Sequence, residues 1–166
     1  MAKKIVKLDV NNEYDFLLLA VICSYKDYRL CFELNQQLKL KLKREKDLEL
    51  INKQKSKSIF SNFYFSNSDN EQFRVINNKG DGKAFIPEMK TIDYFMTIKN
   101  LNHKKNVDDL INRIKEIEII NGVYEMDPNE LKSAENFLML EWQMKKPKNR
   151  TKIIATIGPS SLSNEV

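Results

Sequence analysis

The chain has 166 residues, of which 42% are hydrophobic and 31% are charged, a composition typical of one soluble globular domain. No apolar run approaches the roughly 20 residues of a membrane span, and the charged N-terminus lacks the apolar centre of a signal peptide. Cys23 and Cys31 lie among apolar residues, which favours buried reduced thiols over a disulfide or a metal site. These features predict a cytoplasmic protein with no membrane partner.

The net charge of +5 is unevenly distributed along the chain. Residues 1–143 hold 23 Lys and Arg against 22 Asp and Glu, whereas residues 144–166 hold five basic residues against one acidic residue. The body of the chain is therefore nearly neutral, and the basicity belongs mainly to its C-terminal tail. This distribution weakens the indication of a nucleic-acid partner that an excess of cations would otherwise give.

The N-terminal quarter is predicted to contain one strand and two helices. Residues 4–10 alternate weakly between apolar and polar side chains, which predicts a strand. Residues 14–22 are apolar on nearly all sides at helical spacing, which predicts a deeply buried helix. A second amphipathic helix is expected from Asp27 to about Leu38.

The middle of the chain is predicted to be a meander of antiparallel strands with short turns. Strands are expected over residues 59–65, 71–76 and 92–99, with turns at 66–70 and 77–82. In the last of these strands Ile92, Tyr94, Met96 and Ile98 alternate with more polar residues. This alternation predicts that one face of the strand is the core side.

The remaining elements complete the fold prediction. Asn106 is expected to cap a third helix, which is followed by a strand over residues 123–126. Asp127-Pro128-Asn129-Glu130 has the form of a helix N-terminus and predicts a helix to about Trp142. Together the elements predict an α+β domain over residues 1–143, with a mainly antiparallel sheet, helices packed on one face and a C-terminal tail over 144–166.

One stretch, Ile86-Pro87-Glu88-Met89-Lys90-Thr91-Ile92-Asp93-Tyr94-Phe95, combines a proline, two acidic residues and an aromatic pair at fixed spacing. It resembles the signature of the IPExxxVDY family of small bacterial proteins, with Ile92 in place of the usual valine. The resemblance covers residues 1–143 and also favours a strand over residues 47–51. It implies six motif residues: Ile86, Pro87, Glu88, Asp93, Tyr94 and Phe95. That family has no established activity to transfer to this chain.

Glu88 and Asp93 could pair as an acid and a base. The alternative, which we favour, is that Glu88 supports a turn and Asp93 faces solvent or a backbone amide. Pro87 lacks an N–H and is expected to mark the start of the strand. The only histidine, His103, has no cysteine or second histidine near it, which indicates a surface residue. The residues therefore predict no catalytic, cofactor-binding or metal-binding site.

A run of basic residues over 39–46, together with Lys53, Lys55 and Lys57, could contact the phosphates of RNA. Acidic residues at 45, 47 and 49 and several leucines interrupt this run. We therefore favour a solvated strand edge, where lysines also discourage aggregation between sheets. A nucleic-acid partner is accordingly not expected, and weak nucleic-acid binding is only a third hypothesis for the function.

The composition changes abruptly after Gln143. The segment Arg150-Thr151-Lys152-Ile153-Ile154-Ala155-Thr156-Ile157-Gly158-Pro159-Ser160-Ser161 predicts a strand that ends in a turn. It resembles the N-terminus of pyruvate kinase, in which such a segment forms the first strand of the (β/α)8 barrel. A basic tail that matches that enzyme by chance is the alternative.

The second resemblance leads to two hypotheses for the function. In the first, a non-catalytic partner-binding or regulatory protein is encoded next to or fused to pyruvate kinase, and pyruvate kinase is its partner. In the second, the chain is an N-terminal fragment or extension of a pyruvate kinase, which forms ATP from phosphoenolpyruvate and ADP in glycolysis. The resemblance implies that the catalytic residues would follow this segment, so magnesium and potassium would be needed only if a complete enzyme follows.

Overall fold

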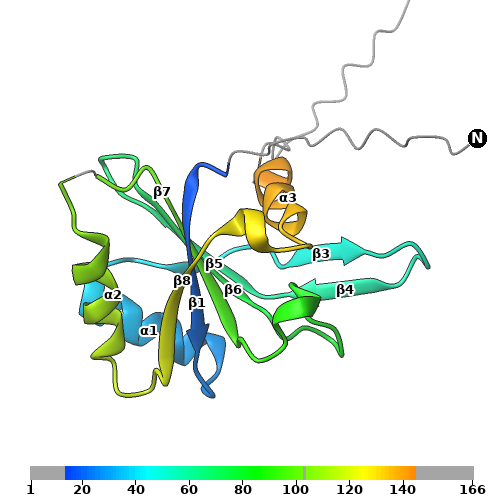
Figure 1. The fold of residues 1–166 in the computed structure, drawn as a ribbon, viewed down its shortest axis with the longest axis horizontal. Helices are drawn as coiled ribbons and strands as arrows, with labels where there is room; N and C mark the ends of the chain where they lie inside the picture. Colours follow the sequence, from blue (N-terminus) through cyan, green and yellow to red (C-terminus); the bar gives the residue numbers. More distant parts are fainter. Residues whose placement is uncertain (1–13, 103, 145–166) are drawn as a thin grey trace, which may run out of the picture.

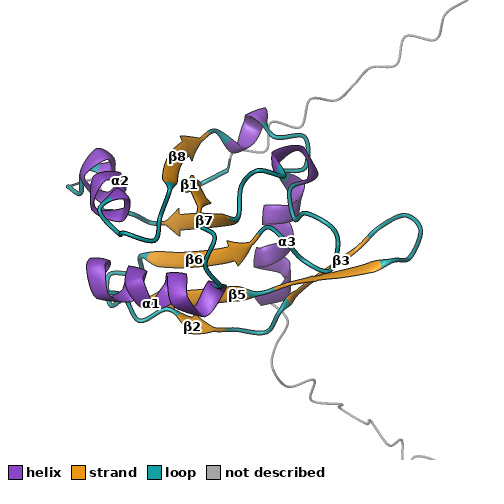
Figure 2. Cartoon of the chain, turned by 90° about the horizontal axis from the view of Figure 1, so that it is seen from below, coloured by secondary structure: helices purple, strands orange, loops and turns teal. Residues whose placement is uncertain are grey.

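The computed structural model describes residues 14–102 and 104–144. Its centre is a six-stranded sheet in the order β2-β5-β6-β7-β1-β8, in which every neighbouring pair is antiparallel (Figure 2). The strands of this sheet are β1 (Phe16–Ile22), β2 (Lys43–Arg44), β5 (Asn62–Ser66), β6 (Gln72–Asn77), β7 (Tyr94–Lys99) and β8 (Gly122–Met126). A separate antiparallel hairpin consists of β3 (Leu48–Ile51) and β4 (Lys57–Phe60).

Helices cover both faces of the sheet. The helical elements are α1 (Asp27–Leu38), α2 (Val107–Lys115), α3 (Glu135–Met144) and the short 3₁₀ turns η1 (Pro87–Met89) and η2 (Pro128–Glu130). Figure 1 shows α1 and α2 on one side of the sheet, with α3 and the β3–β4 hairpin on the other. The predicted α+β class with an antiparallel sheet is confirmed, but the prediction that all helices pack on one face is wrong for α3.

Two hydrophobic cores account for this three-layer arrangement. The first core contains Leu19 and Val21 of β1 together with buried side chains of α1 and α2. The second core contains Leu18 and Ala20 of β1 together with Phe137 of α3. Because successive residues of a strand point to opposite faces, an apolar run without alternation requires cover on both sides of the sheet.

The predicted helix over residues 14–22 is wrong, since Phe16–Ile22 forms the strand β1. Every side chain from Leu18 to Val21 is at most 1% exposed. A short run that is buried on all sides has no periodicity to distinguish a helix from a central strand. Tertiary pairing decides the outcome, because β1 lies between β7 and β8.

Three other predictions need correction. The expected strand over 59–65 is interrupted at Ser61 and contributes β4 to the hairpin and β5 to the main sheet. The motif at Asp127 starts only the 3₁₀ turn η2, because Leu131 returns to an extended conformation, and α3 begins at Glu135. Ile92 was predicted to share a face with Tyr94, Met96 and Ile98, but it precedes β7 and lies in the second core, whereas those three residues lie in the first. Phe95 of β7 also lies in the second core, so both faces of the strand carry buried residues.

Other predicted elements are confirmed. α1 ends at Leu38, where Lys39 adopts the left-handed conformation with φ 57°. Asn106 caps α2, because its side chain accepts a hydrogen bond from the N–H of Asp108. The strand predicted over residues 4–10, His103 and the pyruvate-kinase-like segment lie outside the described residues. None of the helices in residues 14–102 and 104–144 has the length and apolar character needed to cross a membrane.

Candidate functional site

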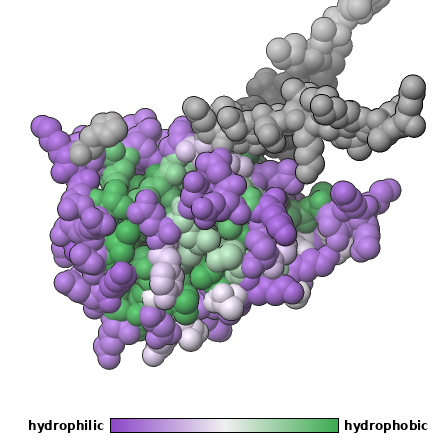
Figure 3. Space-filling view, viewed as in Figure 1, coloured by the Kyte–Doolittle hydropathy of each residue, from purple (hydrophilic) through white to green (hydrophobic). Residues whose placement is uncertain are grey.

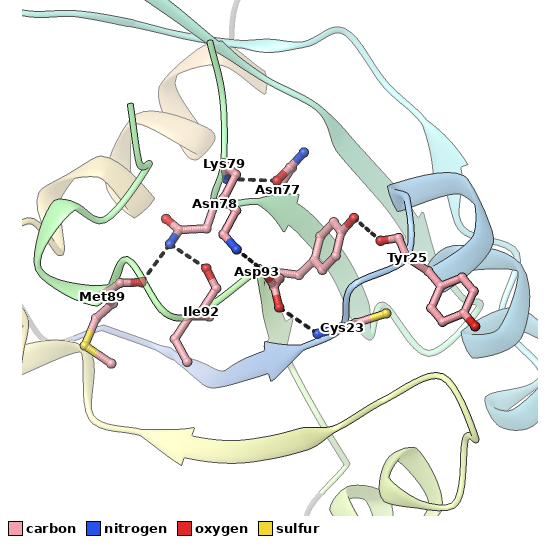
Figure 4. Close-up of polar contacts among 9 residues, drawn as sticks. Cys23, Tyr25, Asn77, Asn78, Lys79, Met89, Ile92 and Asp93 are labelled. Carbon is pink, nitrogen blue, oxygen red and sulfur yellow. Dashed lines mark hydrogen bonds and ion pairs between the residues drawn. The ribbon is translucent and has the colours of Figure 1, made fainter. Parts of the chain in front are cut away.

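The predicted motif segment folds around a buried asparagine, Asn78, which follows β6. Asn78 has no exposed surface. Its side-chain nitrogen donates to the carbonyl oxygens of Met89 and Ile92, both at 2.9 Å (Figure 4). Its side-chain oxygen accepts from the N–H of Ile86 at 2.8 Å. These three bonds hold η1 and the segment leading to β7 against the end of β6. Asn78 thus satisfies backbone groups that would otherwise be buried without partners.

Asp93, which lies just before β7, binds two other segments of the same region. One carboxylate oxygen accepts a hydrogen bond from the backbone N–H of Cys23 at 2.9 Å, just beyond the end of β1. The other oxygen forms an ion pair with Lys79, as Figure 4 shows. The contact with the backbone agrees with the interpretation we favoured from the sequence, and it commits this carboxylate to connecting β1 with the loop after β6.

Glu88 binds a different part of the chain. Its carboxylate accepts a hydrogen bond from the N–H of Ser133 at 2.7 Å and another from the Ser133 hydroxyl at 2.9 Å. Desolvation favours the neutral acid, but hydrogen bonds from Ser133 and from the backbone N–H groups of Glu88 and Lys132 together lower the pKa of Glu88. Glu88 therefore connects η1 to the segment before α3, and the structure does not bring it together with Asp93 as an acid–base pair.

The other four motif residues also have structural roles. Ile86 and Phe95 are fully buried in the second core. The hydroxyl of Tyr94 donates to the carbonyl oxygen of Tyr25 at 2.6 Å, and burial raises the pKa of Tyr94. Pro87 begins η1 rather than a strand, which corrects the prediction made for it, because β7 starts only at Tyr94. The motif thus fixes the position of the loop between β6 and β7.

A second region of interest is the outer edge of β8, the last strand of the main sheet. The N–H of Asn77 donates to the carbonyl of Ser61 at the end of β5, so the alternate residues Ile76 and Arg74 direct their backbone groups toward β7. Their partners in β7, Phe95 and Thr97, therefore direct theirs toward β6. The alternate residues of β7, such as Tyr94 and Met96, then bond with β1, and the alternate residues of β1 bond with β8. In the register of β1 with β8, these residues of β1 lie opposite Gly122, Tyr124 and Met126, whose backbone groups therefore point toward β1. The N–H and C=O groups of Val123 and Glu125 consequently point outward.

The surroundings of this edge are apolar and acidic. Figure 3, viewed toward β8, shows apolar residues gathered on both sides of the strand. Tyr124 is 56% exposed, and Glu125 is exposed. Residues 116–130 contain five acidic residues and no basic one. The opposite edge is shorter and basic, because β2 has only two residues, Lys43 and Arg44, both of which are exposed.

The third region is a groove of about 560 Å³ between the end of α1, the turn between β5 and β6, and the start of α2. Its apolar lining consists of Leu38, Leu40, Phe65, Phe73, Leu101 and Leu110. All of these except Phe73 are only partly buried, and they pack against the first core. Its charged lining consists of Lys39, Lys104, Lys105, Arg113, Glu71 and Asp109.

Glu71 holds two walls of this groove together. Its side chain is only 1% exposed and accepts hydrogen bonds from the side chain of Asn67 at 2.7 Å, the N–H of Asn102 at 3.0 Å and the ammonium of Lys105 at 2.6 Å. Desolvation opposes the charged form, but these donors together lower the pKa of Glu71. The sequence did not indicate this role, because the donors come from separate segments.

Within residues 14–102 and 104–144, no group of three or more His, Cys, Asp or Glu side chains is placed to hold a metal ion. Cys23 and Cys31 are both buried free thiols. No protein-family model matches the chain, and a comparison with curated proteins finds no match.

Proposed function

We propose that this protein is a non-catalytic binding protein that recognises a partner protein by adding an extended, basic segment of that partner to β8. The observation that carries the proposal is the outward direction of the backbone groups of Val123 and Glu125 at an edge flanked by acidic residues. Such groups pair with an added strand through main-chain hydrogen bonds, and this is a recurring mode of peptide recognition. The buried free thiols support a cytoplasmic setting for this activity.

The contrast between the two sheet edges supports the choice of β8. An exposed edge strand is usually protected against pairing by shortness and by lysines, and β2 has both features. β8 is five residues long and carries the half-exposed ring of Tyr124. The five acidic residues between 116 and 130 complement a basic segment and would repel a second copy of the same edge.

A titration with two synthetic peptides tests this proposal. The first alternates lysine with valine, and the second alternates glutamate with valine at the same length. We expect the lysine peptide to bind the full chain and to lose affinity as salt is added, because screening weakens its attraction to the acidic edge. Equal binding of the two peptides, or no binding of the lysine peptide, would contradict the proposal.

A matched pair of variants separates backbone pairing from charge. Glu125→Pro removes an outward N–H, and proline is tolerated at such edge positions. Glu125→Ala removes the same carboxylate but keeps the N–H. Loss of one hydrogen bond costs about 1 kcal/mol, so we expect the proline variant to bind the lysine peptide about fivefold more weakly than the alanine variant. Identical affinities would exclude strand addition at this edge.

Pyruvate kinase is the first partner to test, on the basis of the resemblance in residues 144–166. The segment that resembles its N-terminus begins with basic residues and continues as a predicted strand, which is the chemistry that β8 would accept. We expect a purified bacterial pyruvate kinase to bind the chain, and a peptide with the sequence of residues 145–157 to compete. If pyruvate kinase does not bind but the lysine peptide does, pyruvate kinase is excluded as the partner and strand addition at β8 is retained.

A further inference from the structure

We propose that the groove between α1, α2 and the β5–β6 turn is a binding site for a small anionic amphiphile, a molecule with an apolar chain and a single carboxylate headgroup. The site lies apart from the β8 edge and does not depend on the function proposed for that edge. A volume of about 560 Å³ falls within the range of pockets that bind small molecules. The argument rests on the apolar floor of the groove and on the balance of its charges.

The floor of the groove presents apolar surface that the fold leaves uncovered. Leu40, Phe65, Leu101 and Leu110 are each partly buried and contact the first core from its outer side. They come from four separate segments of the chain, so the surface exists only in the folded protein. An apolar chain laid along this floor would be removed from water, which favours its binding in proportion to the area it buries.

The charged residues of the groove have unequal freedom to bind a ligand. Lys105 is paired with Glu71 at 2.6 Å, and Arg113 donates to the carbonyl of Gln37 at 2.6 Å. Lys39 and Lys104 are exposed, and neither side chain forms an ion pair or hydrogen bond with the residues that the structure describes. These two ammonium groups are therefore available to a headgroup.

The net charge of the lining selects an anion. Four basic side chains face two acidic ones, Glu71 and Asp109, so the lining carries a net charge of about +2 with ordinary ionisation. The Glu71 carboxylate already accepts three hydrogen bonds from the protein, which leaves Asp109 as the acidic group that would oppose a headgroup. Charge complementarity therefore favours a carboxylate near Lys39 and Lys104 over a cationic or neutral head.

Three probes of known chemistry test the proposed site by calorimetry on the full chain. Decanoate has both the chain and the carboxylate, decanol has only the chain, and acetate has only the carboxylate. We expect decanoate to bind at least fivefold more tightly than decanol, and acetate not to bind measurably. Equal binding of decanoate and decanol, or no binding of decanoate at millimolar concentration, would overturn the proposal.

A double variant locates the headgroup. Lys39→Gln with Lys104→Gln should weaken decanoate binding at least fivefold and leave decanol binding unchanged, whereas the control Lys90→Gln on an exposed residue outside the groove should leave both unchanged. Because these lysines are exposed, the variants are expected to fold, and thermal unfolding checks this. Unchanged decanoate binding by the folded double variant, or methyl NMR shifts on decanoate binding that spare Leu101 and Leu110, would overturn the assignment.

Discussion

The Asn78 centre and the β8 edge use backbone hydrogen-bonding groups in opposite ways. At Asn78, backbone groups from three positions of the motif segment are bound by one buried side chain of the same molecule. At β8, the groups of every second residue point away from the sheet. The segment that resembles a family signature thus binds its own fold through a buried side chain, whereas in the function we propose the partner-binding surface is β8, a strand that no motif marks in the sequence.

The largest effect is expected at Asn78. Asn78→Ala removes three hydrogen bonds to buried backbone groups, so the free energy of unfolding should fall by about 3 kcal/mol. The matched control is Asn77→Ala, since Asn77 is more exposed and, among the residues that the structure describes, its side chain binds only the N–H of Lys79. We expect the control to cost less than about 1 kcal/mol. Urea unfolding measures both, and similar losses would contradict the central role of Asn78.

The next effect concerns Glu71 and depends on pH. The folded state lowers the pKa of Glu71, so its stabilisation is present at neutral pH and is lost as the pH falls through the folded-state pKa. Glu71→Gln should cost about 2 kcal/mol at pH 7, because it removes charged hydrogen bonds. The difference from the wild type should shrink in urea unfolding at pH 3.5. A difference that does not depend on pH would show that the charge of Glu71 contributes nothing.

A smaller effect is expected at Glu88, because its side chain is exposed. Glu88→Gln should reduce the free energy of unfolding by less than about 1 kcal/mol, since solvent screens its charge. A double-mutant cycle with Ser133→Ala should show that the two losses are not additive. If Glu88→Gln instead abolished peptide binding while stability was retained, Glu88 would belong to a binding site and the comparison with β8 would fail.

The smallest effect on stability is expected at β8 itself. Glu125→Lys changes an exposed side chain and should alter the free energy of unfolding by less than about 0.5 kcal/mol. It should nevertheless weaken binding of the lysine–valine peptide at low salt, because it reverses a charge at the acidic edge. Thermal unfolding and a peptide titration on the same sample measure both quantities. Unchanged peptide binding at low salt would show that the charge of Glu125 does not contribute to the binding surface.

Local patterns predicted much of the fold. The amphipathic helix capped by Asn106 and the β5–β6 hairpin depend on short-range periodicity and turn chemistry, and both occur in the structure. The run at Phe16–Ile22 was not predictable, because its conformation depends on pairing with β7 and β8, distant in sequence. The second core was not predicted either, because α3 covers a face of the sheet on which no helix was expected.

The candidate sites were less predictable than the fold. Asn77 and Asn78 look alike in the sequence, where both indicate a turn, yet only Asn78 is fully buried. That difference depends on how the motif segment crosses the end of β6. Likewise, the strand order, and hence which strand lies at the edge of the sheet, could not be predicted from the sequence. The groove was not predicted because its residues come from segments that become neighbours only in the folded chain. The acidic composition of residues 116–130 was the one local signal for the β8 edge.

Amide hydrogen exchange along β8, measured by NMR with and without the lysine–valine peptide, tests the central claim most directly. In the free protein, the amides of Val123 and Glu125 should exchange faster than those of Gly122, Tyr124 and Met126, which point toward β1. On peptide binding, Val123 and Glu125 should become protected while Asn78 is unaffected. Protection that does not alternate in the free protein, or peptide binding that leaves Val123 and Glu125 unchanged, would contradict strand addition at β8.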